Sequence, residues 1–408
     1  MTLKTVLGYS GGLDTSVAIR WIKEKYKSEV VCVLVDVGQP LSNLDDAKAR
    51  AIKNGATKVI VVDAKEEFAR DFVLPTLKAN ALYEGVYPLA TSIARPLIAK
   101  HLVAVAHQEG ASYVAHGCTA KGNDQVRFEV TIRALDPALK VIAPLREWNA
   151  DPALATREGE IAYAKEHGIL IPDVATKRTF STDENLWGRS VESGILEDPT
   201  KEVVEDAYEW TTSPLDAPNA PEYVTIGFER GEPVSIDGKR LGLVELINHL
   251  NATAGRHGLG RIDHVENRLV GIKSREVYEA PGAIALLTAH KALENLTLTR
   301  DVAHFKTTLE DKFAELAYDG LWYGALRESI SAFVDKAQEN VTGSVTLKLY
   351  KGAAHVAGRD SPVSLYQKHL ATYDKGDQFR HESAAGFIDI FGLPLRVASS
   401  VKAKHAKK

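Results

Sequence analysis

The chain contains only two cysteines among its 408 residues. Cys32 lies in a β-branched run that predicts a buried strand, and Cys118 lies near a predicted loop. Two cysteines cannot build a disulfide framework, and these two lack the paired spacing of a zinc site. No base is identifiable that would activate Cys118 as a nucleophile. The composition therefore excludes a disulfide-stabilised fold, and we expect both thiols to be reduced.

Long apolar runs and an excess of one charge are also missing. No run approaches the roughly 18 apolar residues of a membrane helix, and residues 1–4 lead into a predicted strand without an apolar signal core. The formal net charge of −4 offers no basic excess for nucleic acid or for an anionic membrane surface. We expect a cytoplasmic protein with small-molecule substrates and with neither a nucleic-acid nor a membrane partner.

The chain is longer than one typical hydrophobic core requires. Its hydrophobic content of 45% and charged content of 25% are typical of a globular protein. We predict three parts: a nucleotide-binding domain over residues 1–170, a second domain over 171–362 that binds substrates and joins subunits, and a C-terminal oligomerisation segment over 363–408.

Buried strands and amphipathic helices alternate over the first 170 residues. Strands are expected at 5–7, 30–35, 58–63, 112–115 and 140–143, and helices at 17–25, 42–54, 66–82, 91–108 and 156–167. Thr91 or Ser92 is expected to cap the fourth helix. This alternation predicts an α/β fold with a doubly wound parallel sheet, in which ligands bind beyond the carboxyl ends of the strands.

The rest of the chain predicts an α+β domain and a C-terminal helical segment. Alternating residues at 223–228 and 233–236 are typical of a hairpin, and helices are expected at 241–253, 283–296, 300–318 and 321–339. Residues 180–190 are polar and predict a loop. A helix at 365–373 and an extended apolar stretch at 387–397 have no core to join, so we expect an oligomer contact there. The basic tail, with Lys402, Lys404, Lys407 and Lys408, is interpreted as a solvated end.

A glycine-rich loop between the first strand and the first helix is the strongest signal. Its residues are Gly8, Tyr9, Ser10, Gly11, Gly12, Leu13, Asp14, Thr15 and Ser16. The two adjacent glycines allow a sharp turn, and the hydroxyls and free N–H groups at the helix N-terminus favour an anion such as pyrophosphate. Asp14 either holds Mg²⁺ or orients a neighbouring N–H. The alternative is an ordinary turn in which Asp14 and Thr15 cap the helix.

The spacing of this loop matches neither a Walker A loop nor a Gly-x-Gly-x-x-Gly turn. The loop resembles the Ser-Gly-Gly-x-Asp-Ser/Thr pyrophosphate loop of the ATP pyrophosphatases. That resemblance implies an enzyme that cleaves ATP between its α- and β-phosphates, adenylates a carbonyl oxygen and then lets a nucleophile displace AMP.

Residues 116–129 form a second polar stretch between a strand and a helix. Asn123 and Arg127 are four residues apart, so they share one face if the helix begins near Asn123, and they could bind one ligand. The structural alternative makes Asp124 a helix cap and Arg127 a solvated charge. His116 is expected to be a satisfied, partly buried histidine rather than a base.

Five stretches together resemble the argininosuccinate synthase family, in order and over essentially the whole chain. They are residues 8–16, 87–96, 116–129, 181–185 and 260–278, of which the run 121–129 is the most specific. Two departures are small. Ala120 stands where the family usually has glycine and could restrict the φ of the loop, and Gly8 stands where the family often has alanine.

The resemblance implies the condensation of citrulline with aspartate, driven by cleavage of ATP to AMP and pyrophosphate. The ureido oxygen of citrulline attacks the α-phosphate, and the aspartate amine then attacks the adenylated ureido carbon. This reaction belongs to arginine biosynthesis and the urea cycle. The resemblance also implies Mg²⁺ as a cofactor and a homotetramer.

The resemblance further assigns residues to each substrate. ATP would be held by residues 8–16, Val35 and Gly117, aspartate by Thr119, Asn123 and Asp124, and citrulline by Tyr87, Ser92, Asn123, Arg127, Ser181, Ser190, Glu266 and Tyr278. Asp14, Asn123 and Asp124 are the implied catalytic residues. Arg127 suits the carboxylate of citrulline and Glu266 its ammonium, while Asn123 would bring the two amino acids together.

Two other functions stay open. A tRNA-modifying enzyme with the same loop would adenylate a base, but it should show a basic face or a cysteine pair for sulfur transfer. A non-enzymatic nucleotide-binding module would explain the first domain. It would leave the polar stretches near Ser181 and Glu266 without a role.

Overall fold

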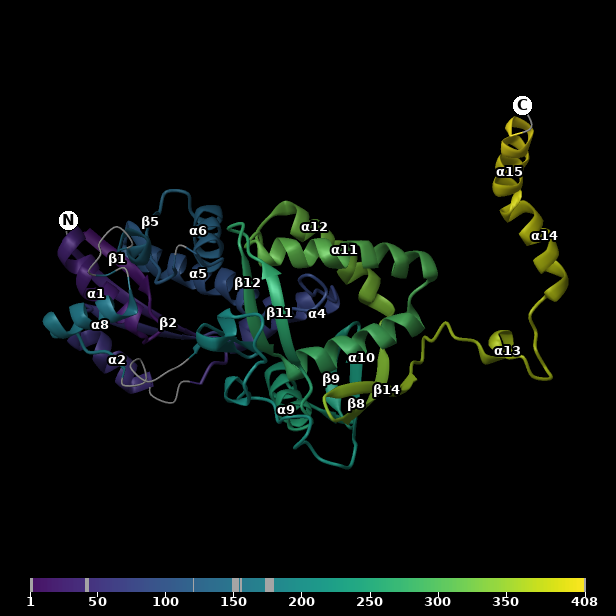
Figure 1. The fold of residues 1–408 in the computed structure, drawn as a ribbon, viewed down its shortest axis with the longest axis horizontal. Helices are drawn as coiled ribbons and strands as arrows, with labels where there is room; N and C mark the ends of the chain where they lie inside the picture. The colour runs from purple at the N-terminus through teal and green to yellow at the C-terminus, as the bar shows by residue number, and fades with distance from the viewer. Residues whose placement is uncertain are drawn as a thin grey trace. The chain divides into compact units, whose positions relative to one another are not determined.

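The computed structural model describes residues 3–40, 44–119, 121–148, 154, 156–172 and 180–406. The chain forms two compact units, residues 1–363 and residues 364–408, and each is described by itself (Figure 1).

A five-stranded parallel sheet lies in the N-terminal part of the first unit. Its strands are β1 (Leu3–Gly8), β2 (Ser28–Asp36), β3 (Lys58–Asp63), β4 (Tyr113–Ala115) and β5 (Lys140–Ile142). Their order is β3-β2-β1-β4-β5, and every neighbouring pair is parallel. The order reverses direction between β1 and β4, where a doubly wound sheet opens a crevice for ligands. The predicted α/β class and parallel sheet are confirmed.

The strands are apolar throughout because helices cover both faces of the sheet. In β2, Val31, Val33 and Val35 pack in one core with α5 (Ala90–Glu109). The intervening residues Val30, Cys32 and Leu34 pack in a second core with α1 (Leu13–Tyr26). This alternation shows that α1 and α5 lie on opposite faces.

The other helices of this part are mostly short. They are α2 (Leu44–Lys53), α3 (Lys65–Phe68), a π-helical turn (Ala69–Val73), α4 (Leu74–Lys78), α6 (Asp124–Leu135), α7 (Pro144–Trp148) and α8 (Arg157–Glu166). The predicted helix 66–82 is thus broken by the π turn and ends at Lys78. The predicted caps of α5 are wrong, since α5 begins at Ala90 after Leu89, which has a φ of 70°.

Residues 180–190 form a hairpin rather than the predicted loop. β6 (Ser181–Asn185) and β7 (Gly188–Glu192) join β11 (Arg261–Asn267) and β12 (Lys273–Glu279) in an antiparallel sheet of order β11-β12-β7-β6. The turn is buried, because Trp187 is 0% exposed and its Nε1 donates to the carbonyl of Pro88 at 2.8 Å. The prediction failed because one face of this sheet lines a polar cavity and so carries polar residues.

A third sheet has the order β10-β9-β8-β13-β14 and is antiparallel, as the hairpin pattern predicted. Its strands are β8 (Glu222–Glu229), β9 (Glu232–Ile236), β10 (Lys239–Arg240), β13 (Gly343–Tyr350) and β14 (Ala353–Asp360). The helices of this part are α9 (Leu243–Arg256), α10 (Pro281–Thr297), α11 (Arg300–Tyr318) and α12 (Ala325–Ala337). Together they make the α+β part of the first unit.

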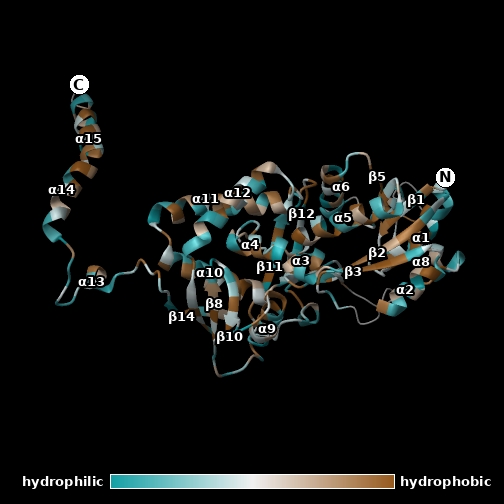
Figure 2. Cartoon of the chain, turned by 180° about the vertical axis from the view of Figure 1, so that it is seen from behind, coloured by the Kyte–Doolittle hydropathy of each residue, from teal (hydrophilic) through white to brown (hydrophobic). Residues whose placement is uncertain are grey.

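The second unit contains α13 (Lys368–Ala371), α14 (His381–Phe391) and α15 (Leu393–His405). The stretch 387–397, predicted to be extended, is helical, and the predicted helix 365–373 is shorter. Apolar side chains along α14 and α15 are exposed, and both helices carry hydrophobic colour in Figure 2. Lys407 and Lys408 lie outside the described residues.

Within the described part of the chain, no single helix is both long and apolar enough to cross a membrane. The pair formed by α14 and α15, which bends by 44°, passes the same test of length and composition.

Candidate active site

A cavity of about 1060 Å³ opens at the carboxyl ends of the parallel strands in the first unit. Most of the residues predicted from the sequence line it: Gly8, Tyr9, Ser10, Gly11, Gly12, Thr15, Val35, Tyr87, Gly117, Thr119, Asn123, Asp124, Arg127, Ser181, Ser190, Glu266 and Tyr278. Leu13, Asp14, Ser16 and Ser92 are not among the lining residues. Ala120 lies outside the described residues.

The glycine-rich loop turns sharply between β1 and α1. Gly11 has a φ of +78°, which a side chain would disfavour. The hydroxyl of Ser10 accepts from the N–H of Gly12 at 3.3 Å and lies 3.1 Å from the hydroxyl of Thr15. Leu13 and Ser16 are buried in the helix that follows, at 4% and 0% exposure. The loop thus presents its backbone and two hydroxyls at the N-terminus of α1, where an anion is stabilised.

Gly117, in the loop after β4, lies directly against the glycine-rich loop. A Cβ atom at Gly117 would lie 2.7 Å from Cγ2 of Thr15. The two loops that flank the crevice therefore touch, and only glycine fits at this position without a shift of Thr15.

His116 and Cys118, in the same loop, show no nucleophile and base arrangement. His116 is buried, and its Nε2 lies 3.6 Å from Oε1 of Glu129. Burial raises the pKa of the Cys118 thiol, which disfavours the thiolate. Cys118 is therefore not an activated nucleophile, but His116 departs from its expected state, because it is almost fully buried and its Nε2 has no hydrogen-bond partner among the described residues.

Asp14 faces Glu160 of α8. Glu160 is 8% exposed, and burial together with the charge and hydrogen bond of Asp14 raises the pKa of Glu160 to about 9. Glu160 is therefore protonated at neutral pH. The described residues hold no group of three histidine, cysteine or carboxylate side chains that could enclose a metal ion.

Replacing Glu160 by Gln should stabilise the folded chain at pH 8. Above pH 4.5, the ordinary pKa of a glutamate side chain, the unfolded chain loses this proton, whereas the folded chain keeps it up to about pH 9. The free energy of unfolding therefore falls as the pH rises between these two values. The amide carries no such cost and can still donate to Asp14. We expect a gain in the free energy of unfolding on the order of 1–3 kcal/mol at pH 8 and much less at pH 5.

Urea denaturation of both proteins at the two pH values measures this effect. Glu158→Gln, an exposed position on the same helix, is the matched control and should show no such pH dependence. An equal gain at both pH values would contradict the raised pKa of Glu160.

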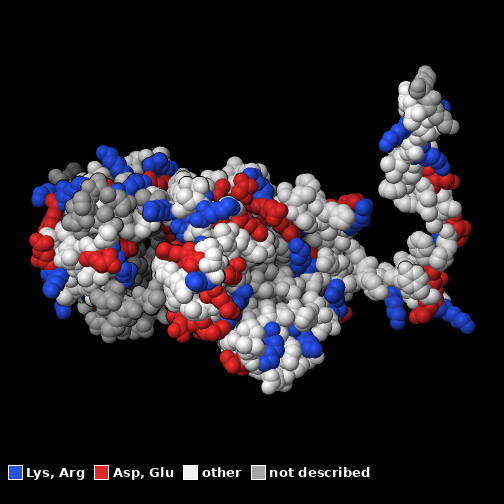
Figure 3. Space-filling view, in the orientation of Figure 1, with Lys and Arg blue, Asp and Glu red and all other residues white. Residues whose placement is uncertain are grey.

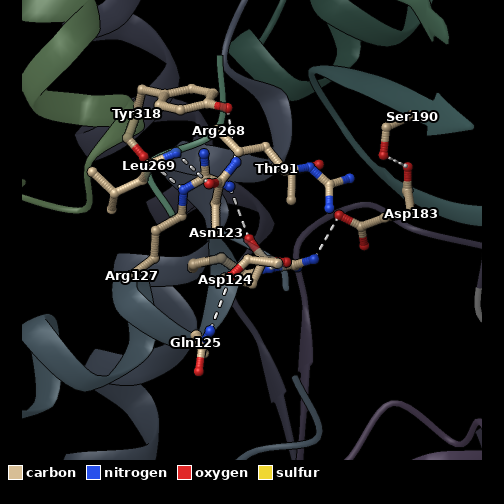
Figure 4. Close-up of polar contacts among 12 residues, drawn as sticks. Thr91, Asn123, Asp124, Gln125, Arg127, Asp183, Ser190, Arg268, Leu269 and Tyr318 are labelled. Carbon is tan, nitrogen blue, oxygen red and sulfur yellow. Dashed lines mark hydrogen bonds and ion pairs between the residues drawn. The ribbon is translucent and has the colours of Figure 1, made fainter. Parts of the chain in front are cut away.

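A hydrogen-bonded cluster joins α6 to the second half of the unit (Figure 4). The hydroxyl of Tyr318 accepts from Nδ2 of Asn123 at 2.7 Å and donates to Glu266 at 2.6 Å. Tyr278 donates to the other oxygen of Glu266 at 2.5 Å, and Oδ1 of Asn123 accepts from the N–H of Leu269 at 2.8 Å. Asn123 and Glu266 are therefore held in fixed orientations in a buried site.

Arg127 and Asp124 form an ion-pair chain on the same helix. Asp124 lies 2.8 Å from Nη1 of Arg127 and accepts a hydrogen bond from Nε of Arg95 at 2.8 Å. Nη2 of Arg95 donates in turn to Asp183 at 2.7 Å. Burial would raise the pKa of Asp124, but the charges of Arg95 and Arg127 outweigh it and lower the pKa. Asp124 thus stays ionised between two guanidinium groups.

Arg127 keeps one nitrogen available. Its Nε donates to the carbonyl of Tyr318 at 2.7 Å, and its guanidinium lies 4.6 Å from the centre of the Tyr318 ring. Its Nη2 is buried and has no hydrogen-bond partner among the described residues. A buried, unpaired guanidinium nitrogen beside a cavity is suited to receive a carboxylate.

The remaining predicted residues lie around this cluster. Tyr87 stacks on Tyr278, with ring centres 4.1 Å apart, and its hydroxyl accepts from the N–H of Thr91. Ser190 donates to the carbonyl of Asp183 at 3.4 Å, and Ser181 begins β6 at the cavity. Ser92 is 0% exposed inside α5.

Sequence reasoning missed several residues that line the cavity. Tyr318 is the last residue of α11, which was predicted as a helix without a role in the site, and Arg95 lies within the stretch 87–96 without having been assigned a role. Arg268 contacts Glu192 at 2.6 Å and pairs with Glu276, and burial with the charge of Glu192 raises the pKa of Glu276 to about 8. Arg95, Arg268 and Glu276 lie within two of the stretches that carry the family resemblance, but no role was assigned to them. Tyr318 lies outside those stretches, and only tertiary packing brings it to the cavity.

Two family models cover most of the chain. The argininosuccinate synthase N-terminal HUP domain matches residues 4–170, and the argininosuccinate synthase C-terminal domain matches residues 180–398. The chain belongs to the argininosuccinate synthase family. The cavity lies where the parts matched by these two models meet, because its lining residues come from both.

Relatives in the argininosuccinate synthase family match over almost their full length. The argininosuccinate synthase of Symbiobacterium thermophilum is 58% identical over 403 residues, which cover 99% of both chains. That of Oceanobacillus iheyensis is 56% identical and covers 99% of this chain and 95% of its own. That of Geobacillus kaustophilus is 57% identical and covers 98% and 97%. The resemblance drawn from the sequence motifs is confirmed.

Proposed function

We propose that the chain condenses citrulline with aspartate to argininosuccinate and cleaves ATP to AMP and pyrophosphate. One observation carries this proposal: a phosphate-binding loop and a buried cluster suited to a zwitterionic amino acid open into one cavity. A passive nucleotide-binding module would not need the buried, unpaired Nη2 of Arg127.

In this proposal ATP lies along the glycine-rich loop. The N–H groups of the loop and the N-terminus of α1 would hold its phosphates, and Val35 and Gly117 would lie beside its adenosine. Leu13, Asp14 and Ser16 would act from behind the loop, since Asp14 contacts Glu160 instead of lining the cavity. Mg²⁺ would enter with ATP as part of the substrate.

Citrulline would bind to the cluster around Tyr318. Its carboxylate would accept a hydrogen bond from Nη2 of Arg127, and its ammonium would pair with Glu266. The two oxygens of Glu266 already accept hydrogen bonds from Tyr278 and Tyr318. Tyr87, Ser181 and Ser190 would lie along the rest of the molecule, and Ser92 would support the Tyr87 side from within α5. The ureido group would then face the α-phosphate.

Aspartate would bind between the two, at Thr119, Asn123 and Asp124. Its amine must lose a proton before it attacks the ureido carbon, and the ionised Asp124 would attract the ammonium form to this position. Asn123, fixed by Tyr318 and by the N–H of Leu269, would hold the amine in line with the carbon.

The proposal extends to location, assembly and pathway. The chain would act in the cytoplasm as a homotetramer, in arginine biosynthesis and the urea cycle, without a nucleic-acid or membrane partner. On the face drawn in Figure 3, acidic and basic side chains are mixed over the first unit, which supports a small-molecule substrate over a polyanion.

An oxygen label tests the reaction directly. The ureido oxygen forms a new bond to the α-phosphorus while the bond to the β-phosphate oxygen breaks and pyrophosphate leaves. The aspartate nitrogen then displaces AMP from the ureido carbon, so the oxygen departs with AMP. Citrulline labelled with heavy oxygen at this position, incubated with MgATP and aspartate, should give labelled AMP and unlabelled pyrophosphate by mass spectrometry.

The other outcomes identify the alternatives. Label in inorganic phosphate would indicate attack on the γ-phosphate. Unlabelled AMP during formation of argininosuccinate would disprove the adenylate, and the absence of any citrulline-dependent product would favour a different adenylating enzyme or a passive binder.

A further inference from the structure

The cavity is lined by four guanidinium groups among the described residues, and three of them are neutralised by carboxylates. Arg95 pairs with Asp124 and Asp183, Arg127 with Asp124, and Arg268 with Glu192 and Glu276. The fourth, Arg50, makes no ion pair within the described ranges. An unneutralised guanidinium in a cavity is suited to bind an anion.

Arg50 reaches the glycine-rich loop from α2, which follows β2 on the other side of β1 from the citrulline cluster. Its Nη2 donates to the carbonyl of Gly11 at 2.9 Å, so the guanidinium is attached to the loop itself. Its Nε is buried without a hydrogen-bond partner among the described residues. A buried N–H donor without a partner is unfavourable because it has lost its hydrogen bonds to water, and binding an acceptor such as a phosphate oxygen would remove this penalty.

The charge of the loop explains why such a group is needed. Residues 8–16 contain no lysine or arginine, and the one charged residue, Asp14, is negative and backed by Glu160. Asp46, one turn before Arg50, also lines the cavity, and the two form no ion pair. Without Arg50, the loop would offer the phosphates only its backbone N–H groups and the hydroxyls of Ser10 and Thr15, none of which carries a full positive charge.

We propose that Arg50 is a phosphate-binding residue that holds the β- and γ-phosphates of ATP and then the pyrophosphate that leaves. The inference rests on the proposed function only for the identity of the reaction. Negative charge accumulates on pyrophosphate as the α–β bond breaks, and a guanidinium fixed to the Gly11 carbonyl stabilises that charge with two planar donors.

Inorganic pyrophosphate and AMP, used separately as ligands, test this assignment. Titration calorimetry with Arg50→Gln should show pyrophosphate affinity reduced by at least about tenfold, while AMP affinity changes less than about twofold. The KM for ATP should rise by a similar factor and the KM for citrulline should not. Arg50→Lys keeps the positive charge but loses the planar set of guanidinium donors. Its pyrophosphate affinity should therefore lie between those of the unchanged protein and Arg50→Gln.

Lys48→Gln is the matched control, since it removes one positive charge from the same helix but does not line the cavity. Its pyrophosphate affinity should equal that of the unchanged protein. Unchanged pyrophosphate affinity in Arg50→Gln, or an equal loss in Lys48→Gln, overturns the proposal. A loss confined to AMP would also overturn it. If Arg50→Gln unfolds, as judged by its thermal transition, the comparison of Arg50→Lys with Lys48→Gln decides.

The two proposals fail separately. Pyrophosphate binding requires neither citrulline nor turnover, so a loss of binding in Arg50→Gln without label transfer in the unchanged protein would contradict only the reaction. Label transfer with normal pyrophosphate affinity in Arg50→Gln would contradict only the role of Arg50.

Discussion

Replacing Arg127 by Ala is expected to raise the KM for citrulline by at least about 30-fold. The substitution removes the buried Nη2, which has no partner among the described residues and is proposed to receive the citrulline carboxylate. A desolvated contact between a guanidinium and a carboxylate is worth on the order of 2 kcal/mol or more. Asp124 keeps Arg95 as its partner, so the fold should survive the change.

Steady-state kinetics with each substrate varied in turn measure this effect. The KM for ATP should change little, because the glycine-rich loop is untouched. Arg133→Ala is the matched control, since the side chain of Arg133 lies on the same helix, is 68% exposed, forms an ion pair with Glu129 and does not line the cavity. A citrulline KM that is normal in Arg127→Ala would disprove this residue assignment while leaving the reaction intact.

Deleting residues 364–408 is expected to convert the proposed tetramer into a smaller species. Four large apolar side chains on α14 are between 64% and 77% exposed: Phe387, Ile388, Ile390 and Phe391. Exposing such a patch to water is unfavourable, so we expect another subunit to cover it. Residues 1–363 form a compact unit by themselves, so the truncated chain should still fold. Multi-angle light scattering gives the mass of each species.

Two single substitutions test whether assembly depends on the apolar side chains of α14 and not only on the presence of residues 364–408. Ile390→Lys should weaken assembly, whereas Asp389→Lys, at a neighbouring position on the same helix whose side chain is 73% exposed, should not. An intact tetramer after the deletion would show that the contact lies elsewhere.

Much of the fold follows from local patterns in the sequence. Strands such as β2 and β3 could be predicted because helices cover both faces, which makes the strand a continuous β-branched run. The hairpin β6–β7 could not, since Asp183 and Ser190 face a polar cavity and remove the expected alternation. The helix α14 was missed because none of its residues is buried in the second unit and because Gly392 and Pro394 interrupt the helical pattern of the apolar stretch 387–397.

The site divides in the same way. The glycine-rich loop and the pair Asn123 and Arg127 are each close together in sequence, so their spacing alone indicated a function. Arg50 and Tyr318 stand in ordinary amphipathic helices, and only packing brings them to the loop and the cluster. Asn123 and Tyr318 are 195 residues apart, and a contact over such a separation leaves no trace in local spacing.

The bridging position of Tyr318 has a consequence for synthesis of the chain on the ribosome. The glycine-rich loop and Arg127 emerge early, whereas Glu266, Tyr278 and Tyr318 emerge more than 130 residues later. A nascent chain that has just completed α8 would already have the loop for ATP, but Asn123 and Arg127 would still lack their support from Tyr318. In the proposed reaction, such a chain could bind ATP but could not orient citrulline beside it. The growing polypeptide would therefore not cleave ATP in the citrulline-dependent reaction before its substrate pocket is complete.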